Sequence, residues 1–455
     1  YDPLGRLSAN IRGGDMQYAT QYRYNIRSWT TDISSCYFKE SLCYNIPRPG
    51  SGTTAQWGGN ISSTTWDDGA SYDYAYDGLS RLRAASHSGS ASLSREYTYD
   101  AHGNITQLTE GQTPHAYAYS GNHLSSAQYD TNGNTVSDPG TGMTSVRYNL
   151  LNLPEEVLKA NGDTVRYAYS ASGAKLRETV IPASGPSVRT DYVGNLVYRD
   201  GLLGRILVDG GAIAAKDSIL TPGYEFAYSD HLGSVRALAH PGDTSYRKTE
   251  YGPYGEVLSE GMTSEYLRLI DPDDEPVDSE EDEVNRIITP GTHLQRTPSL
   301  PSRLSGGASP ATLVTQVVLP AGIITTTLPN PFRFGGKERL DAGGLDLYDF
   351  GARHYTPALP RWMTMDPLAE KYYGVSPYVY CAGNPVNLVD PEGESPETLW
   401  DLASLALGAK SLVSNIKERN VGAAIVDGIG IVADAAAVAL PFVPGGVGAT
   451  IKARR

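Results

Sequence analysis

Cysteine and positive charge are scarce in this 455-residue chain. Its three Cys form no disulfide framework and match no metal-site spacing, so we expect no metal and no cofactor. Cys36 and Cys43 either pair across a tight hairpin or remain isolated thiols. Lys and Arg number 37 against 51 Asp and Glu, which gives a net charge of −14. The chain therefore lacks the basic surface of a nucleic-acid binder.

Phenylalanine is also rare, with 6 residues against 31 Tyr. Because the Tyr hydroxyl needs water or a partner, this preference predicts half-buried strand surfaces rather than a deep apolar core. The chain has 49 Gly and 29 Pro, and this many breakers exclude a helical bundle or a coiled coil. The composition favours many short strands joined by turns.

A short theme recurs along the chain: Tyr, then Asp or a small polar residue, two variable residues, Gly or Asn, and an apolar residue. Doublets such as Tyr97 and Tyr99 place both rings on one face of a strand. Asp then caps a turn and Gly or Asn supplies a positive φ. One hairpin cannot bury its face alone, so neighbours add edge to edge into a continuous sheet. Copies of the theme begin at Tyr1, Tyr76, Tyr99, Tyr129, Tyr148, Tyr169 and Tyr228.

The second half carries longer motif strings in a fixed order. They read YSDHLGSVR at 228–236, YGPYGE at 251–256, FRFGGKE at 332–338, GLDLYDFGARHY at 344–355, and NPV at 384–386. With the repeats, they resemble the YD-repeat (Rhs) family and its C-terminal Rhs-associated core domain. The resemblance implies a mainly β fold, a spiral β-sheet shell closed by the core domain. YNIRSW at 24–29 and GNIS at 59–62 resemble the Bacteroidetes branch.

The resemblance divides the chain into a shell at 1–223, a core domain at 224–394 and an apolar helical pre-toxin linker at 395–455. An insertion at about 257–330 interrupts the core domain. Its stretch 271–283 holds nine acids and no Lys or Arg, so we expect it to be solvated. A calcium loop is the alternative, but no EF-hand spacing is present.

After Ser395, apolar residues recur at the spacing of an α-helix, and Ser-Pro-Glu at 395–397 predicts where that helix starts. A second run, 421–440, is nearly all apolar and long enough to span a membrane. Asp427 and Asp434 would be costly at bilayer depth. This run is therefore either a buried helical hairpin or a segment that contacts the membrane.

The family resemblance also implies self-cleavage by an aspartic-protease-like pair, in which one carboxyl holds a proton while the other activates water. By motif match the pair is Asp366 and Asp390, with Arg361 as the orienting partner. The family motif Asp-Pro-x-Gly-Leu is cut after Leu, whereas Glu394 stands in that position here. Either the pair is weak or silent, or the two Asp only cap turns. We expect no other enzymatic activity, and structural roles for His231 and His354.

The function that the resemblance implies is a shell for a polymorphic toxin, secreted or held at the bacterial surface and used in interbacterial competition. The chain begins within a motif and ends where a toxin domain would begin, so we expect a fragment without its effector. Its own C-terminal toxin, an immunity protein and a specialised secretion machinery would be the partners. The alternative is an extracellular adhesion or carbohydrate-contact protein.

Overall fold

The computed structural model describes residues 1–88, 91–215, 222–264, 328–341, 344–371, 373–394 and 397–398. Within these ranges the chain forms β-strands and short 3-10 turns and no α-helix, which confirms the mainly β fold. The same ranges hold no helix long and apolar enough to cross a membrane. The acidic stretch 271–283 and the apolar run 421–440 lie outside the described residues. The 3-10 turns are Met16–Tyr18, Ala91–Leu93, Phe334–Gly336, Ala369–Lys371 and Cys381–Gly383.

Strands β1 to β26 form what we call the wall of the molecule. The wall begins with a ten-stranded antiparallel sheet whose strands follow chain order. Each strand pairs with its sequence neighbours, as expected for hairpins added edge to edge. Its strands are β1 (Ala9–Asn10), β2 (Thr20–Tyr24), β3 (Thr30–Ser35), β4 (Lys39–Cys43), β5 (Ser63–Trp66), β6 (Ser71–Tyr76), β7 (Leu82–His87), β8 (Arg95–Tyr99), β9 (Ile105–Glu110) and β10 (Thr113–Ala116).

A second sheet of twelve strands continues the wall, after two small pairs formed by β11 (Tyr119–Ser120) with β12 (His123–Leu124) and β13 (Gln128–Tyr129) with β14 (Thr135–Ser137). It too runs in chain order. Its strands are β15 (Met143–Tyr148), β16 (Pro154–Lys159), β17 (Thr164–Tyr169), β18 (Lys175–Ile181), β19 (Val188–Val193), β20 (Leu196–Arg199), β21 (Leu202–Val208), β22 (Gly211–Ala215), β23 (Pro222–Ser229), β24 (Val235–Ala239), β25 (Tyr246–Tyr251) and β26 (Val257–Thr263).

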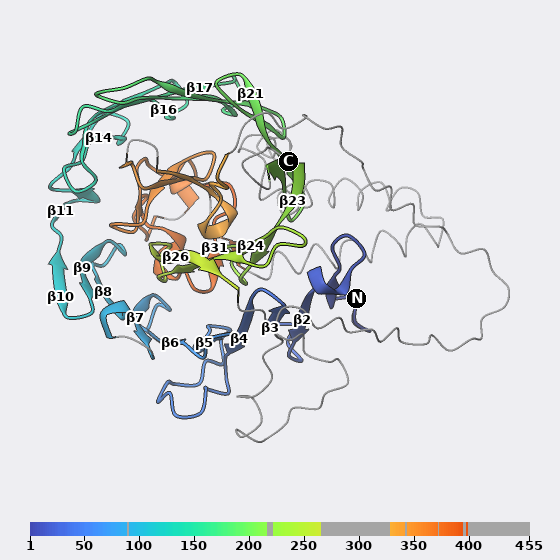
Figure 1. The fold of residues 1–455 in the computed structure, drawn as a ribbon. Helices are drawn as coiled ribbons and strands as arrows, with labels where there is room; N and C mark the ends of the chain where they lie inside the picture. Colours follow the sequence, from blue (N-terminus) through green and yellow to red (C-terminus); the bar gives the residue numbers. More distant parts are fainter. Residues whose placement is uncertain are drawn as a thin grey trace, which may run out of the picture.

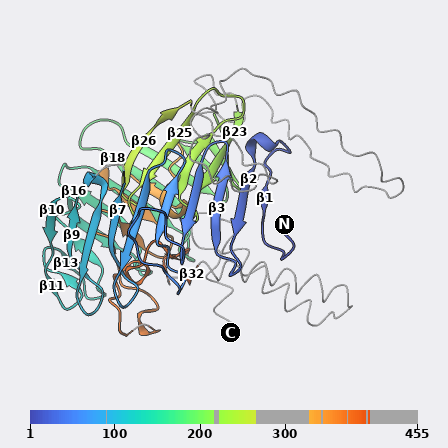
Figure 2. The same ribbon diagram turned by 90° about the horizontal axis from the view of Figure 1, so that it is seen from below.

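The wall curves into a spiral that returns to its own beginning. Figure 1 shows the sheets running around the molecule, with β24 and β26 arriving inside the arc of β3 to β7. In Figure 2 the strands are seen side by side, each running roughly parallel to the axis of the ring. The sheet crosses the boundary expected at residue 223, because β23 spans it, and the first residues of the expected insertion form β26.

Pairs of residues far apart in the sequence join the two ends of this spiral. Each pair links a strand or turn of the first sheet to one at the end of the second. They are Glu40–His231 at 3.1 Å, Asp67–Lys248 at 2.9 Å, Arg95–Glu256 at 3.1 Å, and the hydroxyls of Tyr99 and Tyr254 at 3.0 Å. We call this contact the seam.

Residues 328–394 fill the ring, and we call them the plug (Figure 1). They contain a four-stranded sheet of β27 (Glu338–Leu340), β28 (Leu347–Asp349), β29 (His354–Thr356) and β30 (Arg361–Trp362). Strand β31 (Leu388–Val389) then pairs with β32 (Glu397–Thr398). Aromatic side chains of the plug form one buried cluster with the wall: Phe334, Tyr348, Phe350, Tyr355, Trp362 and Tyr380.

The repeated turn forms as the sequence predicts. In the copy at Asp77, one carboxylate oxygen accepts the backbone N–H groups of Leu79 and Arg81, at 2.9 and 3.0 Å. The rings of Tyr97 and Tyr99 lie on one face, with centroids 6.5 Å apart. The expectation of half-buried Tyr is wrong for many copies, since Tyr97 is 1% exposed. Some hydroxyls find a carbonyl partner inside, as Tyr99 does at Leu82, whereas those of Tyr167 and Tyr169 are buried without a hydrogen bond to the described residues.

Candidate functional site

The two aspartates singled out by the sequence lie around one buried guanidinium. Nη2 of Arg353 is 3.1 Å from Oδ2 of Asp366 and 3.0 Å from Oδ2 of Asp390. Asp390 and Arg353 are each 2% exposed. Burial lowers the pKa of Arg353, although the two carboxylates act in the opposite direction. The structure therefore brings both predicted aspartates together, through a residue to which the sequence analysis gave no role.

Short strands of the plug position the three side chains. Arg353 comes directly before β29, Asp366 follows β30, and Asp390 follows β31. The Arg353 guanidinium lies 4.1 Å from the ring centroid of Trp362, a cation–π contact that helps to hold it in place. Asp366 is held in turn, because its Oδ1 accepts the N–H of Leu368 at 2.7 Å. Each group is thus ordered by its neighbours before any chemistry takes place.

Arg361 lies elsewhere. Its guanidinium stacks 4.9 Å from the ring centroid of Tyr378 and 5.7 Å from that of Tyr129. Among the described residues it makes no ion pair with Asp366, and its two Nη atoms are buried without a hydrogen bond. Nearness in sequence suggested Arg361 as the orienting partner. Arg353 occupies that place because β29 and β30 are antiparallel neighbours that turn the chain back.

The chain after Asp390 is held tightly against this site. The N–H of Glu394 donates to Oδ1 of Asp390 at 3.0 Å, and Nε of Arg353 donates to the carbonyl of Gly393. Nζ of Lys337 donates to the carbonyl of Pro391 at 2.5 Å. Burial lowers the pKa of Lys337. The position at which the resembling family is cut, after residue 394, therefore adjoins one of the two carboxylates.

This arrangement supplies part of what peptide hydrolysis needs. Two carboxylates lie beside a held loop, and one guanidinium contacts both of them. Acid–base catalysis by such a pair needs one carboxyl to carry a proton. Glu394 adds another carboxylate next to the loop, where an apolar side chain would fit at lower cost. Asp366, Asp390 and the backbone of 391–394 are thus assembled around Arg353.

Arg353 and Lys337 had a signal that the sequence analysis did not use. Both interrupt strings of aromatic and glycine residues, in FRFGGKE and in DFGARHY. A charged residue inside a buried aromatic run is rarely buried without a partner. Here the partners are Asp366, Asp390 and the backbone of 391–393.

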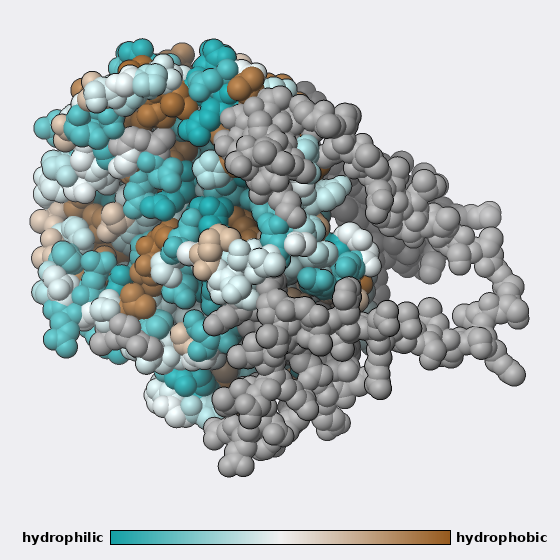
Figure 3. Space-filling view, in the orientation of Figure 1, coloured by the Kyte–Doolittle hydropathy of each residue, from teal (hydrophilic) through white to brown (hydrophobic). Residues whose placement is uncertain are grey.

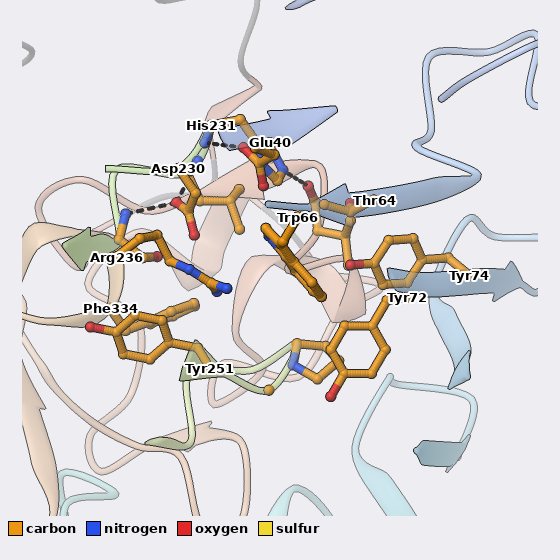
Figure 4. A pocket seen from close by; sticks show the side chains of 15 residues that line it. Glu40, Thr64, Trp66, Tyr72, Tyr74, Asp230, His231, Arg236, Tyr251 and Phe334 are labelled. Carbon is orange, nitrogen blue, oxygen red and sulfur yellow. Dashed lines mark hydrogen bonds and ion pairs between the residues drawn. The ribbon is translucent and has the colours of Figure 1, made fainter. Parts of the chain in front are cut away.

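A second polar site lies at the seam, in a pocket drawn in Figure 4. Nδ1 of His231 is 3.1 Å from both Oε atoms of Glu40, and its Nε2 is 2.9 Å from the carbonyl of Val386. Since both ring nitrogens face acceptors, both carry hydrogen and the ring is an imidazolium. Burial alone would lower the pKa of His231, but Glu40 outweighs it and raises it to about 9. His231 is structural, and it ties the wall to the plug.

A third buried charge, Lys175 on β18, joins the wall to the plug on the opposite arc. Its Nζ lies 2.6 Å from Oε2 of Glu338 and 2.8 Å from Oδ2 of Asp349. The hydroxyl of Tyr192 donates to the other oxygen of Glu338 at 2.5 Å. His354 lies nearby, and burial lowers its pKa to about 4, so it is neutral at pH 7. Lys175 is buried and both of its carboxylate partners lie in the plug, which assigns this cluster to holding the plug in place.

No cluster of three or more His, Cys, Asp or Glu suited to a metal ion occurs in the described ranges. Cys36 and Cys43 are free thiols; Cys36 precedes β4 and Cys43 is its last residue. Residues of differing hydropathy are interspersed over the face seen in Figure 3.

Comparison with known proteins finds likeness in fold and in short stretches of sequence, and no family model matches the chain. A 70-residue segment is 43% identical to the toxin subunit YenC2 of Yersinia entomophaga, covering 15% of this chain and 7% of that protein. A 68-residue segment is 41% identical to the salivary gland surface protein 1 of Aedes aegypti, covering 15% of this chain and 2% of that protein. The chain thus spans a small fraction of these curated relatives.

Solved structures share the fold over most of the chain. The complex TcdB2-TccC3 without its hypervariable C-terminal region matches with a TM-score of 0.55 and 19% identity, over 82% of this chain and 18% of that one. A Photorhabdus luminescens Tc holotoxin pore, carrying an aspartate-to-alanine mutation in TccC3, matches with a TM-score of 0.52 and 17% identity, over 83% and 19%. The chain therefore shares its fold with about a fifth of the length of these toxin-complex chains.

Proposed function

We propose that this chain forms the closing end of a shell that encloses a toxin carried C-terminal to it in the same protein. The observation that carries the proposal is the plug, which fills the ring of the wall with buried aromatic side chains. A shell needs such a closure at one end, whereas an enzyme acting on a separate substrate needs an open pocket. The seam pocket holds only about 30 Å³.

In this proposal residues 1–223 form the wall, 224–394 close it, and 395–455 lead to the toxin. The toxin is the internal partner, and an immunity protein and a secretion machinery serve the parent protein. The setting would be secretion or surface display by a bacterium of the Bacteroidetes branch in interbacterial competition. The segment similar to a toxin subunit and the fold of toxin-complex shells support this assignment.

Imaging the parent protein with its downstream region tests the proposal. Cryo-electron microscopy should show a hollow particle closed at one end by the plug, with additional density inside. An open sheet, or a particle whose downstream region lies entirely outside the wall, would contradict it.

We further propose that Asp366 and Asp390 are an assembled self-cleavage pair, with Arg353 as the positioning residue. We propose that this pair is silent, so the chain stays intact after Glu394. The contact of Arg353 with both carboxylates and the acidic residue at 394 support a silent pair. Intact mass of fresh protein should show no product ending at residue 394. Glu394→Leu, which supplies the apolar side chain of the family motif, should release that product.

Two controls make this experiment decisive. Asp390→Asn or Asp366→Asn, placed in the Glu394→Leu background, should abolish the product if the pair does the chemistry. Glu370→Leu, in the first Asp-Pro motif, is the matched control that should leave the chain intact. No cleavage in any Glu394→Leu preparation would mean that the two aspartates only cap turns.

The adhesion alternative has one observation in its favour, the short segment similar to a salivary gland surface protein. Exposed aromatic residues such as Tyr373 at 87% and Trp57 at 64% are the side chains that would stack on sugars. A glycan array tests this function. Binding lost in Tyr373→Ala or Trp57→Ala would support it, and an array without any bound glycan would remove it.

A further inference from the structure

The seam pocket is a small cavity lined by three separate parts of the chain. Strands β4 to β6 supply one side, the turn after β23 with β24 and β25 the second, and the plug residues Phe334 and Val386 the third. Its volume is about 30 Å³. A cavity of 10–15 Å³ already holds one water molecule, so this one has room for a small ion.

Arg236 reaches into this cavity (Figure 4). The residue is 3% exposed, and its guanidinium is held among aromatic rings: 4.8 Å from the centroid of Trp66, 5.5 Å from that of Phe38 and 5.6 Å from that of Tyr251. It makes no hydrogen bond and no ion pair with any residue in the described part of the chain, and its Nε is fully buried. A guanidinium carries five N–H donors, and a buried donor without a partner, such as this Nε, is costly.

A second donor in the same pocket is also without a partner. The indole N–H of Trp66, which lines the cavity beside Arg236, is buried and unbonded. The nearby carboxylates are already engaged. Both oxygens of Glu40 contact His231, and Oδ1 of Asp230 accepts the backbone N–H groups of Leu232 and Ser234. The lining therefore combines two cations, Arg236 and His231, with the carboxylates of Glu40 and Asp230. Within it, the guanidinium of Arg236 and the indole N–H of Trp66 are the donors without a partner among the described residues.

We propose that the seam pocket binds a small monovalent anion of the size of chloride, held by the guanidinium of Arg236 and the N–H of Trp66. Chloride is only slightly larger than water and accepts hydrogen bonds from several donors at once. Since wall strands from both ends of the spiral line the pocket, a bound anion would tighten the seam.

Bromide tests the site directly. Crystals of the chain soaked in sodium bromide, with data collected at the bromine absorption edge, should give an anomalous peak between Arg236 and Trp66. The peak should disappear in Trp66→Phe, which keeps an aromatic ring and removes the N–H donor. Density without anomalous signal would identify water and overturn the proposal.

A solution measurement covers variants that do not crystallise. At equal ionic strength, replacing sodium gluconate by sodium chloride should raise Tm of the wild-type chain by a few degrees, because the anion binds only the folded seam. Arg236→Met and Trp66→Phe should lose this chloride-specific rise. Arg147→Met, which removes a 64% exposed guanidinium, should retain it. An equal rise in all variants would show a general salt effect and contradict the site.

Discussion

The tyrosine hydroxyl explains why this chain uses Tyr where other β proteins use Phe. Tyr76 donates to the carbonyl of Ile61 at 2.7 Å, and Tyr148 donates to that of Thr135 at 2.7 Å. The acceptors lie 15 and 13 residues earlier in the chain. One ring thus packs on its own strand while its hydroxyl satisfies a backbone group of the neighbour. Phe at these positions would leave that carbonyl without its partner.

Tyr148→Phe tests this role. We expect the free energy of unfolding to fall by about 1 kcal/mol, because a buried carbonyl loses its hydrogen bond while ring packing is kept. Urea denaturation measures the change. Tyr373→Phe is the matched control, since that ring is 87% exposed, and it should have no measurable effect. Equal stability of both variants would show that the hydroxyl contributes nothing.

Because His231 is an imidazolium in the folded chain, the free energy of unfolding changes with pH in the alkaline range. Its pKa is raised from 6.5 to about 9 in the folded chain, so its contribution is complete below pH 6.5 and is lost as the pH rises through 9. The full loss amounts to about 3 kcal/mol if Glu40 stays ionised.

We therefore expect the unfolding free energy of the wild-type chain to decrease between pH 6.5 and 9. His231→Gln should be less stable at pH 6.5 and should show a flatter profile over this range. His115→Gln, at a residue whose side chain is 45% exposed, serves as the control and should follow the wild type. A wild-type profile that does not change from pH 6.5 to 9 would refute the ion pair.

At the scale of elements, the hairpins could be predicted because residues close together in the sequence determine each turn. Asp100 and Asn104 lie within five residues of each other, and the turn they form depends only on that stretch. The position of the plug could not be predicted in the same way. Arg353 and Asp390 are far apart in sequence, and only the pairing of short strands brings them together. Arg361 is suggested by the sequence alone because it lies only five residues before Asp366.

Lys175 provides an element-scale prediction, because it holds β18 of the wall to β27 and β28 of the plug. Lys175→Met leaves Glu338 and Asp349 buried without their cation, so we expect a loss of about 3–5 kcal/mol. Adding Glu338→Gln should restore part of it. Lys371→Met removes an exposed amine and should be neutral. Thermal unfolding of the four proteins separates these outcomes, and a stable single variant would show that the plug is held without this cation.

At the scale of the whole molecule, closure depends on contacts between distant parts of the chain. The seam joins the first sheet to the end of the second, and the plug packs against the inside of both. Closure is what distinguishes a container from a flat sheet, and it is the feature on which the proposed function depends.

Protease protection of the parent protein tests the enclosing function most directly. The full protein, with its region downstream of residue 398, is treated with a broad-specificity protease and followed by mass spectrometry. We predict that the downstream region resists cleavage in the wild type and becomes sensitive when Lys175→Met loosens the plug, while Lys371→Met leaves it protected. Cleavage of the downstream region in the wild type, at the rate seen when it is expressed alone, would contradict the account.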